Sequence, residues 1–173
     1  MVTLPWFTLN HMPGSQFDSI ALEIETFASV AYSLEALQRF AVDLIARRLD
    51  RYNWVGFYML DPADPATLVL GPFAGAPTEH TRIPVARGIC GAAVAQQQSI
   101  IVDDVAGDPR YLACSIETRS EIVVPIRVHG RIAGEIDVDS HTPAAFDAAD
   151  CAFLERCAAA FGAFIERTPK QSE

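Results

Sequence analysis

The sequence predicts a single α+β domain in which helices near both ends of the chain flank an antiparallel sheet. Three observations support this fold class. Apolar residues recur with helical spacing near each end, strand-like segments fill the middle, and two of those segments form a clear hairpin. Strands and helices do not alternate along the chain, so a parallel βαβ sheet is not expected.

The first helical region covers residues 18–49. Its apolar positions are spaced by three and four residues, as in an amphipathic helix, at Phe27, Val30, Leu34, Leu37, Ala41 and Leu44. Ser33 lies inside this region and can cap a helix N-terminus. The region can therefore divide into two helices at Ser33.

Strand-like segments follow. Residues 52–60 are rich in aromatic and β-branched side chains and end at a turn of Asp61 and Pro62, and residues 67–70 predict a second strand. Proline and glycine punctuate residues 71–88, which predicts an irregular connection with at most one short strand, at residues 81–85.

The middle of the chain predicts a short helix over residues 91–97, with Cys90 at its start. Unpaired N–H groups and the helix dipole at that position favour a thiolate. A short strand is expected at residues 100–103. Residues 108–120 then form a loop with at most one helical turn.

A hairpin and a helix complete the chain. Residues 121–128 and 131–139 form the hairpin around a His129-Gly130 turn. The helix covers residues 147–166, with an apolar face of Phe153, Leu154, Cys157, Phe161, Phe164 and Ile165. Cys157 belongs to this face and Cys151 does not, and neither is expected to be catalytic.

Composition excludes several classes of function. The formal net charge is -9 and no basic stripe is present, so a nucleic-acid partner is not expected. Residues 1–13 lack the charge and apolar core of a leader, and no run of about 18 uncharged apolar residues occurs. We therefore expect a cytoplasmic protein without a membrane partner.

The cysteines and histidines do not form a recognisable framework. Four cysteines without a secretory signal favour free thiols over structural disulfides. No C-x-x-C pair occurs and the four histidines are scattered, so no metal site and no cofactor are predicted.

Carboxylates at alternate positions mark one face of the hairpin. Glu135, Asp137 and Asp139 share a face by strand periodicity. Such a face can simply be solvated, as one side of an antiparallel sheet often is. The partner strand is almost wholly apolar after Glu121, which favours a covered site with Glu121 at its mouth.

Trp54 and Tyr58 are four residues apart and also share a face. If this is the carboxylate face, an aromatic wall opposes an acidic patch, which suits a small cation or an ammonium group. The alternative is ordinary core packing of two aromatic side chains.

Cys90 and Cys114 are in loop-like stretches, where functional groups are more frequent than in cores. Because a thiol is both a nucleophile and a redox group, thiol chemistry on a small polar molecule is the leading hypothesis. Spacing does not show whether the two sulfurs meet, which requires Cα atoms within about 7 Å.

Six motifs together resemble the free methionine-(R)-sulfoxide reductases, which are stand-alone GAF-domain enzymes. The resemblance covers about residues 20–165. The motifs are Asn53-Trp54-Val55-Gly56-Phe57-Tyr58, Leu70-Gly71-Pro72-Phe73, Arg87-Gly88-Ile89-Cys90-Gly91, Ala113-Cys114-Ser115, Arg119-Ser120-Glu121-Ile122-Val123-Val124-Pro125-Ile126 and Ile136-Asp137-Val138-Asp139-Ser140.

The resemblance implies a six-stranded antiparallel GAF-like sheet and, usually, a homodimer. It implies that Cys114 is the catalytic cysteine and that Cys90 can form a disulfide with it. The residues matching the substrate pocket are Trp54, Tyr58, Glu121, Asp137 and Asp139. We expect residues 18–167 to form the domain, with an N-terminal extension at 1–17 and a tail at 168–173.

The implied reaction reduces free methionine-(R)-sulfoxide. Cys114 becomes a sulfenic acid, Cys90 condenses with it, and a thioredoxin-type reductant restores both thiols. The rival hypothesis is a GAF sensor that binds a small ligand without catalysis. A purely structural dimerisation domain is a third hypothesis, but it leaves the acidic face unexplained.

Two departures from the family pattern bear on these hypotheses. Relatives commonly have a further cysteine just before Arg-Ile-Pro, where this chain has Thr78-Glu79-His80-Thr81 before Arg82. Glu135 replaces what is usually a small apolar residue.

Overall fold

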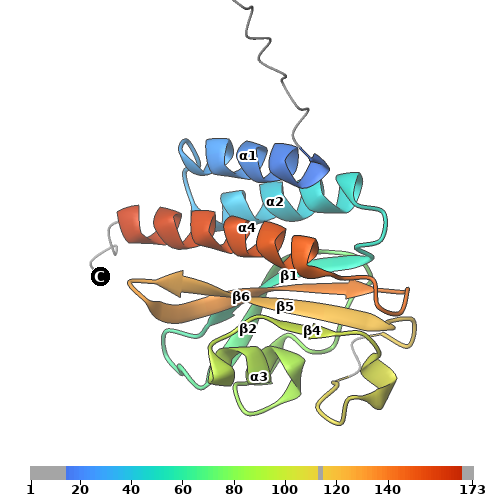
Figure 1. The fold of residues 1–173 in the computed structure, drawn as a ribbon. Coiled ribbons are helices and arrows are strands. Elements are labelled where there is room, and N and C mark those ends of the chain that lie inside the picture. Colours follow the sequence, from blue (N-terminus) through green and yellow to red (C-terminus); the bar gives the residue numbers. More distant parts are fainter. Residues whose placement is uncertain (1–14, 113–114, 169–173) are drawn as a thin grey trace, which may run out of the picture.

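A six-stranded antiparallel sheet lies between two unequal layers of helices in the computed structural model, which describes residues 15–112 and 115–168 (Figure 1). The strand order is β3-β2-β1-β6-β5-β4. The strands are β1 Trp54–Leu60, β2 Thr67–Ala74, β3 Arg82–Pro84, β4 Ile100–Val102, β5 Ser120–Val128 and β6 Arg131–Ser140. The predicted α+β class with six antiparallel strands is confirmed.

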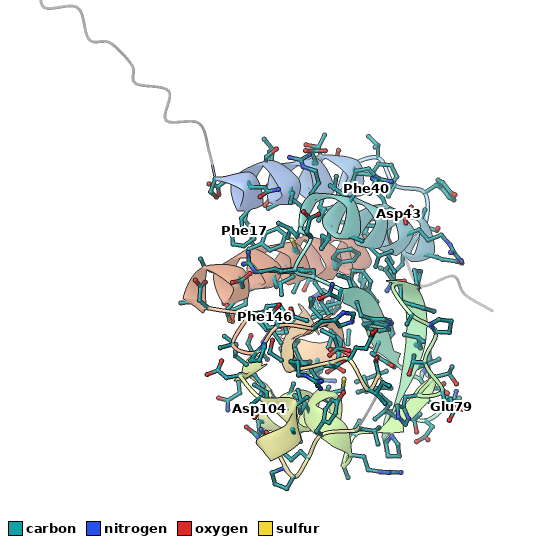
Figure 2. All side chains as sticks on the ribbon, turned by 90° about the vertical axis from the view of Figure 1, so that its right-hand side faces the viewer. Phe17, Phe40, Asp43, Glu79, Asp104 and Phe146 are labelled. Carbon is teal, nitrogen blue, oxygen red and sulfur yellow. The ribbon has the colours of Figure 1, made fainter. Side chains whose placement is uncertain are left out.

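Three long helices lie on one side of the sheet, the first of them packed on the other two, and one short helix covers the other side (Figure 1). The long helices are α1 Gln16–Ala28, α2 Leu34–Arg48 and α4 Ala148–Arg167, and the short one is α3 Gly88–Gln96. Figure 2 shows this separation from the side, with Phe17 and Phe40 in the three-helix layer and Asp104 on the opposite side of the sheet. Among the described residues, no helix combines the length and apolar content needed to cross a bilayer.

Side-chain caps begin the three long helices. Ser15 and Asp147 each form a capping box, at α1 and α4. The Ser33 hydroxyl accepts a hydrogen bond from the backbone N–H of Ala36 at 3.1 Å. Ser33 therefore divides the N-terminal region into two helices, as its position predicted.

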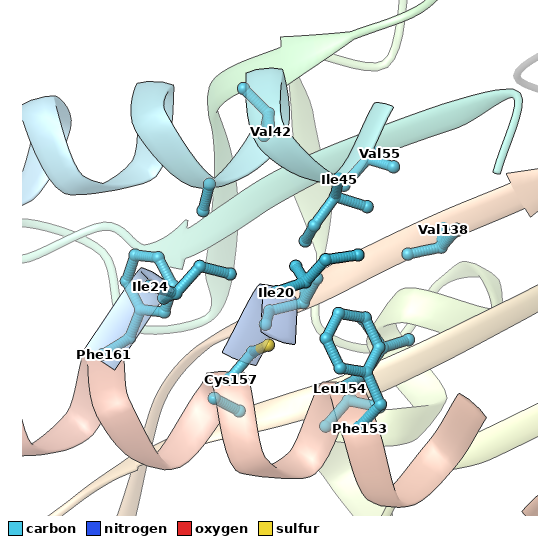
Figure 3. Close-up of a cluster of buried hydrophobic side chains, with 14 of the residues drawn as sticks. Ile20, Ile24, Val42, Ile45, Val55, Val138, Phe153, Leu154, Cys157 and Phe161 are labelled. Carbon is cyan, nitrogen blue, oxygen red and sulfur yellow. The ribbon is translucent and has the colours of Figure 1, made fainter. Parts of the chain in front are cut away.

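The larger core lies between the three long helices and the sheet (Figure 3). Helix residues such as Ile20, Ile45 and Leu154 pack there against Val55 and Val138 from the central strands. Alternate residues of those strands point to the opposite face, so the sheet is buried on both sides. The predicted role of Cys157 as a small core residue is confirmed, since it is 1% exposed.

The predicted end of the second strand was wrong. β2 continues past the expected end at residue 70 to Ala74, because Phe73 pairs with Gly56 on β1 and stacks on Trp54. In the described part of residues 108–120 no helical turn is present. This is consistent with the predicted loop, and one helical turn that was not predicted spans Val105–Gly107, where the Asp104 side chain caps it.

Candidate active site

Four carboxylic acids come together on the face of the sheet that α3 covers. Three are at alternate positions of β6, and the fourth is on β5, directly opposite Asp139. They are Glu121, Glu135, Asp137 and Asp139, and each is at most 5% exposed. The alternative that this face is solvated is therefore wrong, and Glu121 is buried within the cluster instead of lying at an open mouth.

Trp54 and Tyr58 share this face with the acids. Trp54 pairs with Asp139 across β1 and β6, and Tyr58 pairs with Glu135. The predicted aromatic wall beside an acidic patch is thus confirmed. The core-packing alternative also holds, because both aromatic side chains belong to the smaller core cluster beneath α3.

Hydrogen bonds attach this aromatic wall to the connection between β2 and β3. The Trp54 indole N–H donates to the carbonyl of Ala76 at 3.0 Å, and the Tyr58 hydroxyl donates to the carbonyl of His80 at 2.8 Å. The indole also stacks on Tyr58 and Phe73, with ring centroids 6.3 and 5.6 Å apart. These contacts restrict both the rings and the backbone beside the acids.

Cys90 reaches the acids from the first turn of α3. Its Sγ–H donates to Oδ2 of Asp137 at 3.4 Å. One ligand atom from each of Cys90, Glu121 and Asp137 lies within 4.8 Å of the other two. The thiol and two carboxyl groups therefore form one compact set of donor atoms.

Gly91 allows α3 to approach the sheet this closely. A Cβ atom at this position would lie 2.7 Å from the carbonyl oxygen of Val85, nearer than real Cβ contacts. Gly56 has a similar role under the aromatic wall, where a Cβ atom would lie 2.2 Å from Cη2 of Trp54. Two glycines thus permit the packing that places Cys90 and the indole beside the acids.

Burial governs the protonation of the acids. It raises the pKa of Glu121, Glu135 and Asp139 well above their ordinary values, and neighbouring carboxylates raise these pKa values further. Burial also raises the pKa of Asp137 to about 7, against the hydrogen bond from Cys90. Because no ion pair among the described residues involves any of the four, the cluster retains protons at neutral pH.

The prediction that Cys90 is a thiolate is wrong. Its position at the start of a helix favours a thiolate, yet burial raises the pKa of this thiol, and Asp137, Glu135 and Glu121 raise it further. Loss of hydration and three nearby carboxyl groups outweigh the partial positive charge of a helix N-terminus. Cys90 is therefore a protonated thiol in the resting protein.

Glu135 is the least satisfied member of the cluster. It is fully buried, and neither of its carboxyl oxygens has a hydrogen-bond partner in the part of the chain that the structure describes. The same is true of Oδ1 of Asp137. Strand periodicity grouped Glu135 with the other acids, although the family pocket implied by the motifs did not include it.

Thr118 is a further residue of the site that the sequence patterns did not single out. It is 3% exposed, and a hydrogen bond from its side chain lowers the pKa of Asp139. It precedes β5 and belongs to no periodic pattern. Cys114 lies outside the described residues, so its predicted convergence with Cys90 stays a prediction.

A groove runs along α3, and its lining among the described residues includes none of the four acids. Its volume is about 580 Å³, and its lining includes Arg87, Gly88, Arg110, Tyr111 and Leu112. The groove therefore runs along the chain segment that leads towards the motif of Cys114.

Comparisons with known proteins show which family the chain resembles. The GAF domain family matches residues 26–165. Protein YtsP of Bacillus subtilis is 43% identical over 115 residues, which are 66% of this chain and 69% of YtsP. The free methionine-R-sulfoxide reductase of Escherichia coli is 45% identical over 97 residues, which are 56% of each chain.

Solved structures of related proteins match the fold of this chain over a larger share of its residues than the sequence matches cover. The free methionine-R-sulfoxide reductase of Neisseria meningitidis, in complex with its substrate, has a TM-score of 0.82 and 35% identity, with 87% of this chain and 88% of that chain covered. The reduced form of the enzyme from Staphylococcus aureus has a TM-score of 0.80 and 30% identity, covering 88% and 97%.

Fold and site together define a GAF-domain protein with a buried cluster of acids, aromatic rings and a thiol. Within the GAF family, the chain belongs to the free methionine-R-sulfoxide reductases, as its motifs implied.

Proposed function

We propose that this protein reduces free methionine-(R)-sulfoxide to methionine, with Cys114 as the nucleophile and Cys90 as the resolving thiol. Family membership makes the chain an oxidoreductase that acts on a sulfur group. The observation that carries the proposal is the cluster of four buried acids beside the thiol of Cys90 and the ring of Trp54.

The acids suit the ammonium group of a free amino acid. Four buried carboxyl groups without an ion pair among the described residues can ionise more easily when a cation enters. A methionine within a peptide lacks this ammonium group. The aromatic wall of Trp54 and Tyr58 supplies the apolar and cation-attracting surface that such a ligand needs.

The first chemical step transfers oxygen from the substrate to the protein. The Cys114 thiolate forms a bond to the sulfoxide sulfur, and a buried acid protonates the sulfoxide oxygen, which becomes a hydroxyl group on that sulfur. This hydroxyl group then moves to the sulfur of Cys114 while the bond between the two sulfurs breaks and leaves an electron pair on the substrate sulfur. Methionine leaves, and Cys114 carries the oxygen as a sulfenic acid. The net change is sulfoxide plus thiol to thioether plus sulfenic acid.

The second step regenerates the dithiol. The thiol of Cys90 attacks the sulfenic acid, so that a disulfide forms and water leaves with the thiol proton. Asp137 already accepts a hydrogen bond from this thiol, so it is placed to take the proton first. A thioredoxin-type dithiol then reduces the disulfide by exchange. We also propose a homodimer, which sedimentation of the purified protein tests.

Replacement of Cys114 tests the nucleophile. Cys114→Ser should abolish reduction of free methionine-(R)-sulfoxide, while Cys151→Ser, which changes a partly exposed thiol on α4, should retain it. A Cys114→Ser protein with the normal rate would refute the proposal.

Thiol titration separates the enzyme from a ligand-binding GAF sensor. The absence of a cysteine before Arg82 favours the sensor alternative. After exposure to the sulfoxide, an enzyme loses two titratable thiols, at Cys90 and Cys114. A sensor loses none.

A further inference from the structure

We infer that the reduced protein binds one divalent metal ion of the zinc class through the side chains of Cys90, Glu121 and Asp137. The three donor atoms already lie within 4.8 Å of one another, and all three residues are buried. They come from α3, β5 and β6, so the fold assembles the set from three separate elements.

The spacing of two donors already matches a tetrahedral zinc site. With Zn–S and Zn–O bonds of about 2.3 and 2.0 Å, the sulfur and oxygen ligands of such a site are about 3.5 Å apart. The distance between Sγ of Cys90 and Oδ2 of Asp137 is 3.4 Å. Glu121 completes the set by a shift of roughly 1.5 Å or less, within reach of a rotation of its carboxyl group.

Buried acceptor atoms beside the three ligands are a second observation that fits a cation. Glu135 is fully buried, and neither of its carboxyl oxygens has a partner at hydrogen-bond distance among the described residues. It also faces the metal ligands, because the thiol of Cys90 lowers the pKa of Glu135 and Asp137 raises it. Oδ1 of Asp137 is also buried without a partner. A buried acceptor of this kind is costly unless a proton or a cation satisfies it.

Charge and ligand type identify the class of ion. On metal binding, the thiol and both carboxyl groups lose their protons and become three negative charges. A divalent ion then leaves the site with a single net negative charge. A thiolate ligand favours zinc-like ions over calcium and magnesium, which prefer oxygen. Three protein ligands leave one tetrahedral position open to water.

The metal site overlaps the cluster that we propose for the substrate ammonium group. Zinc and methionine-(R)-sulfoxide should therefore compete if both proposals hold. Binding of Co²⁺ can be measured without reductase activity. The result therefore tests the metal site even if the proposed reaction is wrong.

Cobalt(II) provides a direct readout of thiolate ligation. Titration of the reduced, metal-free protein with Co²⁺ should give a near-ultraviolet sulfur-to-cobalt charge-transfer band that saturates at one ion per chain. One equivalent of Zn²⁺ should remove the band. Cys90→Ser should lose it, and Asp137→Asn should weaken binding by about tenfold or more.

Cys157→Ser is the matched control, because Cys157 is also buried but lies in the other core. This variant should retain the band. Glu135→Gln provides a further variant that keeps all three ligands, and it should bind Co²⁺ more weakly while the band persists. A wild-type protein without the band, or a band that survives in folded Cys90→Ser, would overturn the inference.

Discussion

The thiol of Cys90 donates a hydrogen bond to the carboxyl group of Asp137, a residue 47 positions further along the chain, with 3.4 Å between Sγ and Oδ2. This contact joins the first turn of α3 to the centre of β6. The proton of the thiol is therefore shared with a buried acid. A change at either residue should alter the pKa of the other.

Asp137→Asn should lower the pKa of the Cys90 thiol. After burial itself, Asp137 is the largest cause that raises this pKa, and the amide keeps the shape of the side chain while it removes the negative charge. Ultraviolet absorbance of the thiolate, recorded against pH in metal-free protein, measures the change. Subtraction of the same titration for Cys90→Ser isolates this thiol. An unchanged pKa would show that burial alone controls Cys90.

Glu135→Gln should make stability less dependent on pH. Burial raises the folded-state pKa of Glu135 above its ordinary value of 4.5, so the folded state holds this proton more tightly than the unfolded state. Stability from this group is therefore full at low pH and is lost as pH rises above about 4.5. Urea unfolding of metal-free protein between about pH 5 and pH 8 should show a smaller loss for the variant, by about 1–3 kcal/mol.

Asp43→Asn is the control for this comparison. Asp43 is an exposed carboxylate on α2, in the helical layer away from the acid cluster (Figure 2). The pH profile of this variant should follow that of the wild-type protein. A Glu135→Gln profile that also follows the wild type would contradict a buried, proton-retaining Glu135.

Gly91→Ala should displace α3 and disturb Cys90. The added Cβ would lie 2.7 Å from the carbonyl oxygen of Val85, and backbone cannot move aside as easily as a side chain. We expect a loss of about 1–3 kcal/mol in the free energy of unfolding and slower disulfide formation. Gly107→Ala adds the same methyl group where no atom lies within 4 Å. Equal stability of the two variants would count against tight packing of α3.

Trp54→Phe should weaken the attachment of the β2–β3 connection to the site. The variant keeps an aromatic ring beside Tyr58 and Phe73 but loses the hydrogen bond to the carbonyl of Ala76. We expect a loss of about 1 kcal/mol in stability and a higher KM for the sulfoxide. Tyr58→Phe removes the neighbouring bond to His80 and should act in the same direction. An unaltered KM in both variants would place the aromatic wall outside the substrate site.

Local patterns in the chain were sufficient for most of the secondary structure. Ser33 ended one helical region and began the next because its hydroxyl can satisfy a free backbone N–H. The two-residue period of β6 placed Glu135, Asp137 and Asp139 on one face, and the spacing of Trp54 and Tyr58 did the same on β1. These relationships depend only on residues near one another in sequence.

What covers each face depends on residues far away in the chain. Strand period cannot tell a solvated acidic face from a buried one, and only the packing of α3 and neighbouring segments against the sheet decided that the acids are buried. The same packing reversed the expected charge state of Cys90, because the carboxyl groups beside it come from β5 and β6. β2 likewise extended to Ala74 through pairing with β1. A local pattern specifies which way a side chain points, whereas burial and pKa depend on the tertiary contacts that surround it.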